Sequence, residues 1–286
     1  MIQPDLVGAD LLDQIAATCP HPSEIAVWWL GQSGFLIKSR KGLMLIDPYL
    51  SEHLTKKYEN TSKPHIRMTA APFRGEDLVG VDLVLCSHKH SDHMDPGTLP
   101  SLMANNPNAT MIVPCSLVEH ARSLGIDPEQ IIAMDPGDLH AQSGFLVRAI
   151  PSAHEDLDLD SDGRHLYLGY IVETDGLRFY HSGDCVVFDD LEHWLGTDPY
   201  DIFFLPINGR DPSRGVSGNM SASESVSLAA LLRPRYLVPH HYDMFTFNTV
   251  PIADFEKAAT LLPSGVIPRV LRCGERWLVT KSDVGD

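Results

Sequence analysis

The sequence lacks several features that define special classes of protein. Its longest apolar stretches, such as residues 26–30 and 202–207, fall far short of the ~20 residues that a membrane-spanning helix needs. The five cysteines form no Cys-x-x-Cys pair and are odd in number, which argues against a disulfide framework and a zinc ribbon. The first residues, MIQPDL, carry neither the basic segment nor the apolar core of a secretory signal. We therefore expect a cytoplasmic protein that does not enter a membrane.

Basic residues are also scarce. The chain has 22 Lys and Arg against 38 Asp and Glu, a formal net charge of 22 − 38 = −16. Proteins that bind nucleic acids hold the phosphate backbone with clustered Lys and Arg, so this excess of acid argues against a nucleic-acid partner. A small anionic substrate stays possible, because it needs only a local positive group or a metal ion. The 286 residues, 43% of them hydrophobic, suit one large domain or two small ones. No linker divides the chain, so we expect a single domain over residues 1–286.

The hydrophobic pattern predicts strands alternating with helices in both halves of the chain. The Asp175-Gly176 pair predicts a tight hairpin, and Ser221 with Glu224 predicts a capping box at a helix start. Residues 51–78 are polar and predict a surface segment. We expect a single sheet-rich α/β sandwich that opens with an antiparallel meander. The predicted strands are 25–30, 34–38, 43–46, 82–86, 111–113, 166–174, 177–181, 201–207, 236–239, 269–271 and 277–280, and the predicted helices are 9–17, 95–104, 116–124, 221–232 and 252–262.

Histidine is abundant, with fourteen in the chain, and it is the commonest metal ligand in proteins. Three histidines and an aspartate lie within six residues, His88-Lys89-His90-Ser91-Asp92-His93, directly after the predicted buried strand 82–86. On such a strand-to-helix turn His88 and His90 can face one ion, and Asp92 and His93 can face a second. A solvated polar loop is the alternative interpretation, but four such side chains at this spacing favour a metal site.

This six-residue pattern resembles the H-x-H-x-D-H signature of the metallo-β-lactamase superfamily. The resemblance implies an αβ/βα four-layer sandwich, with two mixed sheets flanked by helices. It also implies further ligands at the ends of later strands, for which the sequence offers His154, Asp184 and the pair His240-His241; the Pro-x-His pattern favours His241. The implied assignment is His88, His90 and His154 for one ion, Asp92, His93 and His241 for the other, and Asp184 as the bridge. Two divalent ions, Mn²⁺ or Zn²⁺, fit these nitrogen and oxygen ligands.

Other segments resemble the L-ascorbate-6-phosphate lactonase (UlaG-like) branch of this superfamily. This resemblance implies a metal-dependent lactonase that opens a small sugar-acid or sugar-phosphate lactone by attack of metal-bound hydroxide, with Asp92 as its catalytic proton-handling group. The opening WLGQSGF and the histidine-containing ending also resemble phospholipase-D-type phosphodiesterases, so that activity is the alternative. A homo-oligomer is expected from the branch. The segments that carry the resemblance are 29–35 (WLGQSGF), 46–50 (IDPYL), 180–184 (YHSGD), 212–220 (PSRGVSGNM) and 238–243 (VPHHYD).

Candidate contacts for an anionic substrate lie between the strand 201–207 and the capped helix that follows it. Loops at strand ends carry many functional side chains, and an arginine there can clamp a phosphate through two hydrogen bonds. The alternative for Arg214 is a surface ion pair with Asp211. Histidines outside the ligand set, apart from His181 and His240 beside it, are expected to have ordinary roles. The predicted substrate contacts are Asn208, Arg210, Arg214, Asn219, His240 and Tyr242.

Overall fold

The apolar runs of the sequence form strands whose two faces enter different hydrophobic cores. The computed structural model describes residues 1–281; the last five residues of the expected domain, 282–286, lie outside the described part. Side chains alternate across a strand, so a strand covered on both sides needs apolar residues at every position. Along β1 (Glu24–Gly31) the alternation is complete: Ile25, Val27 and Trp29 enter one core, and Ala26, Trp28 and Leu30 enter the other.

The strands form two seven-stranded sheets, each of them mixed. Each sheet combines an antiparallel set of strands with a parallel set. The order of the first sheet is β14 (Arg276–Thr280), β1, β2 (Gly34–Lys38), β3 (Leu43–Ile46), β4 (Leu83–Leu85), β5 (Thr110–Pro114) and β6 (Ile131–Met134). The order of the second is β13 (Ile267–Pro268), β12 (Tyr236–His240), β11 (Ile202–Pro206), β10 (Leu177–His181), β9 (Leu168–Thr174), β8 (Phe145–Pro151) and β7 (Leu139–Gln142).

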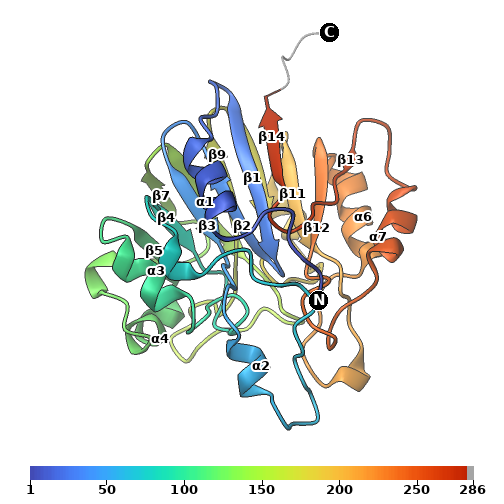
Figure 1. Ribbon diagram of the computed structural model, residues 1–286. Coiled ribbons are helices and arrows are strands. Elements are labelled where there is room, and N and C mark those ends of the chain that lie inside the picture. Colours follow the sequence, from blue (N-terminus) through green and yellow to red (C-terminus); the bar gives the residue numbers. More distant parts are fainter. Residues whose placement is uncertain (282–286) are drawn as a thin grey trace.

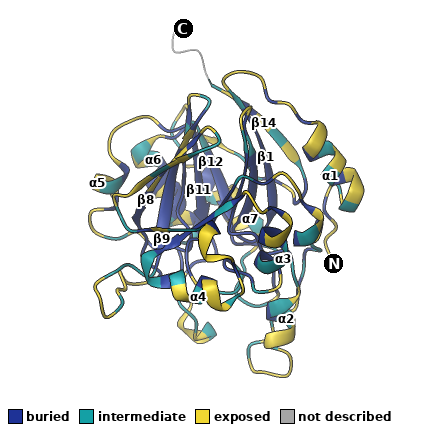
Figure 2. Cartoon of the chain, turned by 90° about the vertical axis from the view of Figure 1, so that its left-hand side faces the viewer, coloured by how far each residue is buried: buried dark blue, intermediate teal, exposed yellow. Residues whose placement is uncertain are grey.

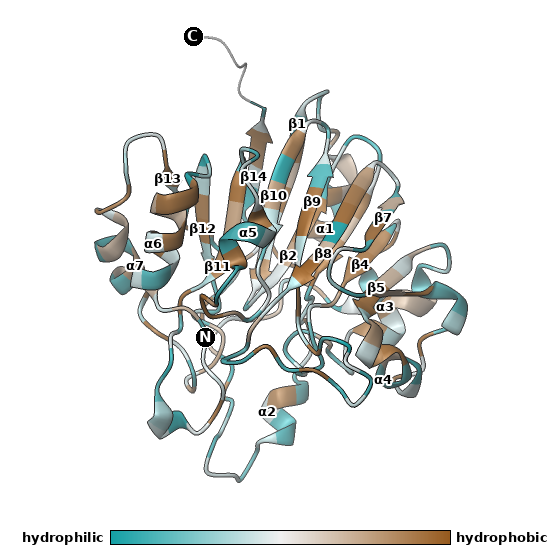
Figure 3. Cartoon of the chain, turned by 180° about the vertical axis from the view of Figure 1, so that it is seen from behind, coloured by the Kyte–Doolittle hydropathy of each residue, from teal (hydrophilic) through white to brown (hydrophobic). Residues whose placement is uncertain are grey.

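Helices cover the outer faces of both sheets, as Figure 1 shows with α3 and α4 at one side and α6 and α7 at the other. Strands make up the buried centre in Figure 2 and the apolar centre in Figure 3. Residues of both sheets share one core, and α1, α3 and α4 pack on the first sheet in another. This is the predicted four-layer sandwich. The helices are α1 (Gly8–Ala17), α2 (His53–Lys57), α3 (Leu99–Asn105), α4 (Val118–Ser123), α5 (Leu191–Leu195), α6 (Ala222–Leu232) and α7 (Ile252–Ala259).

Local turn signals in the sequence are confirmed in detail. β1, β2 and β3 form the expected antiparallel meander. Asp175 and Gly176 both have positive φ, 48° and 79°, as a two-residue hairpin turn requires, and they join β9 to β10. Ser221 and Glu224 form the capping box of α6, with each side chain accepting a hydrogen bond from the other residue's backbone N–H.

Some predicted boundaries are wrong, for local reasons. The strand expected at 269–271 is absent, and the short β13 lies just before it at Ile267–Pro268. The helix expected from Asp95 begins at Leu99, because the Asp95 carboxylate accepts hydrogen bonds from Gly97 N and Thr98 Oγ1 and holds a turn there. Among residues 1–281, no helix is both long and apolar enough to cross a membrane.

Candidate metal centre

The predicted ligands come from loops that follow strands of both sheets. His88, His90, Asp92 and His93 follow β4, His154 follows β8, Asp184 follows β10, and His241 follows β12. These loops meet at one edge of the sandwich, and potential ligand atoms lie within 4.8 Å of one another in three groups. The groups are His88, His90 and His154; His88, His93 and Asp184; and Asp92, His93 and His241. Residues 153 positions apart in the sequence thus surround one small volume.

Several polar atoms at the centre of this cluster have no hydrogen-bond partner although they are buried. They include His88 Nε2, His93 Nε2 and Asp184 Oδ1. The last two lie 3.2 Å apart, without the alignment of a hydrogen bond. Buried polar atoms are nearly always paired, so a group of unpaired ones facing each other calls for a missing partner. Imidazole nitrogens and carboxylate oxygens of this kind fit divalent ions such as Zn²⁺ or Mn²⁺.

Asp47, directly after β3, holds the first ligand loop in place. Its carboxylate accepts hydrogen bonds from Ser87 N (2.7 Å) and Ser87 Oγ (2.6 Å), and its Oδ2 lies 2.7 Å from His93 Nδ1. His93 therefore donates through Nδ1 to Asp47, which leaves the Nε2 lone pair directed at the cluster centre. The sequence analysis missed this role. The available signal was an acid between the apolar run 43–46 and a proline.

Two further contacts orient ligands from the remaining loops. His154 Nδ1 lies 3.0 Å from the Gly218 carbonyl oxygen, so that hydrogen bond fixes the ring with Nε2 toward Asp184. Gln32, in the β1–β2 turn, donates from Nε2 to Asp92 Oδ2 at 2.8 Å and lies 3.1 Å from His241 Nε2. The sequence analysis treated Gln32 only as part of a turn. Partners that fix the orientation of metal-binding side chains tune the affinity for the ion.

Three non-glycine residues at the site have a left-handed backbone. The φ angles are 51° for Gln32, 44° for Asp47 and 63° for His241. Such conformations are uncommon for residues with a Cβ and persist where the surrounding structure enforces them. At the end of β12 this turn separates two neighbours, because His241 returns to the cluster while His240 stays on the strand.

The charges of the cluster shift the pKa values of its members in opposite directions. Burial alone would raise the pKa of Asp184, but the neighbouring His241 and His93 hold it well below its usual range. Burial lowers the pKa of His90 to about 4 and that of His88 well below its usual value. Burial would also lower the pKa of His93, but Asp184, Asp47 and Asp92 outweigh it and raise that pKa. The ionised carboxylate of Asp184 and the neutral imidazoles of His88 and His90 are the forms that bind a cation, and a bound cation would replace the proton that the surrounding carboxylates favour on His93.

The two neighbours offered by the sequence, His240 and His241, have different surroundings. His241 lies in the cluster, with Nε2 at 3.3 Å from Asp184 Oδ2. His240 is fully buried behind it, with Nδ1 at 3.0 Å from Ser33 Oγ and its ring stacked on His181 at 4.9 Å between centroids. The His181–His240 pair thus supports the strand ends beneath the cluster and does not face the pocket.

The other residues predicted to contact a substrate also have partners within the fold. Arg210 pairs with Glu224 of the capping box, and Tyr242 Oη donates to the Leu271 carbonyl oxygen at 2.8 Å. Asn208 accepts from Asn219 Nδ2 and donates to Asn248 Oδ1, both at 3.0 Å. Arg214 donates to the same Asn248 oxygen at 3.0 Å, and its Nε lies 3.8 Å from Asp211. Each of these side chains thus has a partner within the fold, and its contact with a substrate stays a prediction.

A cavity of about 470 Å³ opens beside the cluster. It contains none of the six residues predicted to contact substrate, but Asn248, which Asn208 and Arg214 hold, is in its wall. Its lining also includes His65 and His120, two histidines that the sequence analysis regarded as ordinary. The lining residues are Leu54, Lys57, Tyr58, His65, Lys89, His90, Ser91, Asp92, His120, His154, Asp184, Val216, Ser217, His241 and Asn248.

Solved structures with this fold include several metallohydrolases. Igni18, a metallo hydrolase from the archaeon Ignicoccus hospitalis, matches with a TM-score of 0.65 and 21% identity, over 91% of this chain and all of that chain. An isothiocyanate hydrolase from Delia radicum gut bacteria matches with a TM-score of 0.69 and 17% identity, over 90% of this chain and all of that chain. At these identities the likeness shows the metallo-β-lactamase fold alone.

Relatives found by sequence comparison identify the family. The beta-lactamase superfamily domain matches residues 44–242. A UPF0173 metal-dependent hydrolase of Pyrococcus furiosus is 30% identical over 260 residues, which cover 88% of this chain and 98% of the relative. One of Pyrococcus horikoshii is 31% identical over 258 residues, with the same coverage. The chain is therefore a metal-dependent hydrolase that belongs to the UPF0173 family of the metallo-β-lactamase superfamily.

Proposed function

We propose that this hydrolase is a lactonase that opens a small sugar-acid or sugar-phosphate lactone. The observation that carries the proposal is the cavity of about 470 Å³ with the His and Asp cluster in its wall, which suits a substrate of a few rings at most. The resemblance of residues 29–35, 46–50 and 180–184 to the L-ascorbate-6-phosphate lactonase branch supports the choice of a lactone.

The ligand roles proposed from the sequence agree with the three groups of side chains. His88, His90 and His154 would hold one divalent ion, Asp92, His93 and His241 would hold a second, and Asp184 would lie between them. When bound, such ions lower the pKa of a water molecule toward neutrality and polarise the carbonyl group that is attacked. The set contains no thiolate, so Mn²⁺ and Zn²⁺ both fit it.

Asp92 is the proposed proton-transfer group. Its side chain is 16% exposed and lines the cavity, whereas that of Asp184 is 4% exposed. Burial would raise the pKa of Asp92, but the charge of His93 and that of His241 outweigh it and keep the carboxyl ionised. In lactone hydrolysis the water oxygen bonds to the carbonyl carbon and the ring C–O bond breaks. Asp92 can take the proton that the water loses and return it to the departing ring oxygen.

Gln32 gives Asp92 the orientation for this role. Because its amide donates to Asp92 Oδ2, the carboxylate is held in one orientation. The backbone carbonyl of Gln32 in turn accepts from His241 N at 3.0 Å and from Trp29 Nε1 at 2.9 Å, which fixes the turn itself. A carboxylate in a fixed orientation can exchange a proton efficiently with a substrate that is bound in the matching position.

The test is hydrolysis of L-ascorbate 6-phosphate and of bis(p-nitrophenyl) phosphate, each with Mn²⁺ and with Zn²⁺. We expect ring opening of the lactone, with a loss of activity in Asp92→Asn when the bound metal, measured by elemental analysis, is retained. Hydrolysis of the diester alone would contradict the lactonase proposal and favour the phosphodiesterase alternative.

A further inference from the structure

The cavity beside the cluster has an unusual balance of charge for so acidic a chain. Its only carboxylates, Asp92 and Asp184, belong to the cluster itself. The rest of its lining contains two lysines, Lys57 at the end of α2 and Lys89 in the loop after β4, and no acid. With 38 acidic residues against 22 basic ones in the chain, this wall is positive where the average surface is negative.

Neither lysine has an anionic partner among residues 1–281. No carboxylate lies within 4.0 Å of the ammonium group of Lys57 or Lys89, and neither group donates a hydrogen bond there. Lys57 Nζ lies 5.4 Å from the centre of the Tyr58 ring. Lys63, close by in the sequence, differs from both, because it donates to the Gly215 carbonyl oxygen.

The positive charge of Lys89 affects the pKa of His120, which also lines the cavity. Burial lowers the pKa of His120, and the charge of Lys89 lowers it further. His120 is therefore neutral near pH 7 and leaves Lys89 as the charged group on its side of the cavity. A lysine ammonium on a flexible stem is a point charge well suited to a phosphate or carboxylate.

An aromatic surface lies next to these lysines. Tyr58 stacks on His65 at 4.4 Å between ring centroids, with 28° between the planes. Phe245 and Phe247 support His65 from behind, each at 5.1 Å. Burial lowers the pKa of His65, which makes the ring neutral. The lining thus offers a flat, largely apolar face on which the carbon skeleton of a small ring can pack.

We propose that Lys57 and Lys89 bind an anionic group that the substrate carries away from the bond being cleaved, while its ring packs on Tyr58 and His65. The substrate class is then a small phosphorylated or carboxylated lactone in preference to a neutral one. This inference rests on the proposed lactonase function for the reaction, but the subsite itself can be tested without turnover.

The kinetic test compares two pairs of lactones that differ only in the anionic group: D-glucono-1,5-lactone with its 6-phosphate, and D-glucono-1,4-lactone with D-saccharic acid 1,4-lactone as the carboxylate arm. In Lys57→Ala/Lys89→Ala we expect KM for the phosphorylated lactone to rise by about tenfold or more. The kcat for that substrate and the KM for the neutral lactone stay unchanged. Lys56→Ala is the matched control, because Lys56 is the exposed neighbour on α2 and does not line the cavity.

The binding test uses the corresponding products, D-gluconate 6-phosphate and D-gluconate, titrated calorimetrically into the metal-loaded protein. We expect the wild type and Lys56→Ala to prefer the phosphorylated product, and the double lysine variant to lose that preference. Equal affinity of the wild type for both products, or a preference that survives in the double variant, would overturn the subsite. Failure to open any lactone while the preference persists would refute the lactonase function and leave the subsite in place.

Discussion

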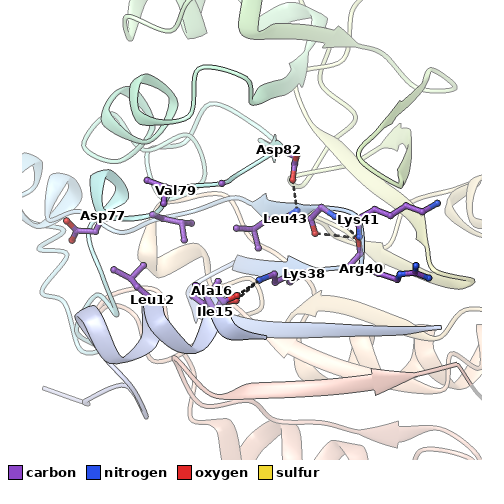
Figure 4. A pocket seen from close by; sticks show the side chains of 14 residues that line it. Leu12, Ile15, Ala16, Lys38, Arg40, Lys41, Leu43, Asp77, Val79 and Asp82 are labelled. Atoms are coloured by element: carbon purple, nitrogen blue, oxygen red, sulfur yellow. Dashed lines mark hydrogen bonds between the residues drawn. The ribbon is translucent and has the colours of Figure 1, made fainter. Parts of the chain in front are cut away.

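Two cavities of this protein differ in whether the polar groups buried at their edges have partners within the fold. The first, of about 340 Å³, lies between α1 and the β2–β3 turn (Figure 4). There Lys38 Nζ donates to the Ile15 and Ala16 carbonyl oxygens, at 2.7 and 3.0 Å, in the last turn of α1. Asp82 accepts from Leu43 N and from Ser143 Oγ, both at 2.8 Å.

The cavity beside the cluster has the opposite character. His88 Nε2, His93 Nε2 and Asp184 Oδ1 are buried without partners, and Lys57 and Lys89 have no carboxylate near them in the described part of the chain. The comparison teaches that charged residues in a hollow are not by themselves evidence of a site. Where the fold pairs buried polar atoms they stabilise it, and where it leaves them buried and unpaired, as at His88, His93 and Asp184, a ligand is the expected partner.

The largest effect that this comparison predicts is that of metal removal. Chelation should abolish hydrolysis, because without the ions nothing in the cluster lowers the pKa of the attacking water or polarises the carbonyl group. It should also lower the free energy of unfolding by about 4 kcal/mol relative to protein held at a thousandfold excess of ion over its Kd. Denaturant unfolding with and without chelator measures this difference. Equal stability in both conditions would mean that the unpartnered cluster atoms hold no ion.

Next in size is the loss of a single cluster side chain. His88→Ala and Asp184→Ala should each lower kcat/KM by more than about a hundredfold, beyond the range of an outer partner, with bound metal reduced in elemental analysis. His193→Ala is the control, because His193 is exposed on α5 and lies outside the cluster. Full activity in either cluster variant would contradict the metal assignment.

A smaller effect is expected from the acid that orients the cluster, and the first cavity supplies its matched control. Asp47 and Asp82 both accept a backbone N–H and a serine hydroxyl, but only Asp47 also holds a cluster imidazole. Asp47→Asn should weaken metal affinity by about 10–100-fold, because His93 loses its carboxylate partner. Asp82→Asn should leave metal affinity unchanged in a competition titration with a chromophoric chelator, and equal losses in both variants would refute this role of Asp47.

The smallest effect is expected in the cavity at α1. Lys38→Met removes the two hydrogen bonds to the end of α1 and should lower the free energy of unfolding by about 1 kcal/mol. Kinetic constants for the lactones should not change, since Lys38 donates to the end of α1 and does not line the cavity beside the cluster. A raised KM for the phosphorylated lactone in this variant would show that the first cavity also takes part in anion binding.

Local signals in the sequence predicted the parts of the fold that local chemistry controls. The Asp175-Gly176 hairpin and the Ser221–Glu224 capping box depend on neighbours within four positions, and both are confirmed. The strands β6 and β7 were missed, because each has only four residues and is mostly outside the buried core. The strand expected at 269–271 is wrong because apolar composition alone does not provide a pairing partner in a sheet.

In the candidate site, too, some features follow from the local sequence and others only from the tertiary structure. The spacing of His88, His90, Asp92 and His93 is a property of one loop, so the sequence alone was enough to predict their convergence. Contacts with a substrate depend on which loops meet in space. Arg210 and Arg214 were the donors that the sequence favoured by position, but each has a partner within the fold. No local pattern marked Lys57 or Lys89 as residues of the cavity, and the position of Asp47 before a proline did not reveal its contact with His93.

By itself, the sequence determined most strands, two turns and the spacing of the imidazoles after β4, because strand alternation and turn chemistry are encoded locally. The four-layer arrangement and the later ligands were predicted from the resemblance to the metallo-β-lactamase superfamily. Only the tertiary structure decided which charges remain unsatisfied. It sends His241 to the cluster and leaves His240 on its strand through one left-handed residue. It also brings α2 and the loop after β4 to the same cavity, where two lysines in an acidic chain face no acid outside the cluster. The physical reason is that a partner is defined by distance in space, and residues far apart in the chain acquire that distance only on folding.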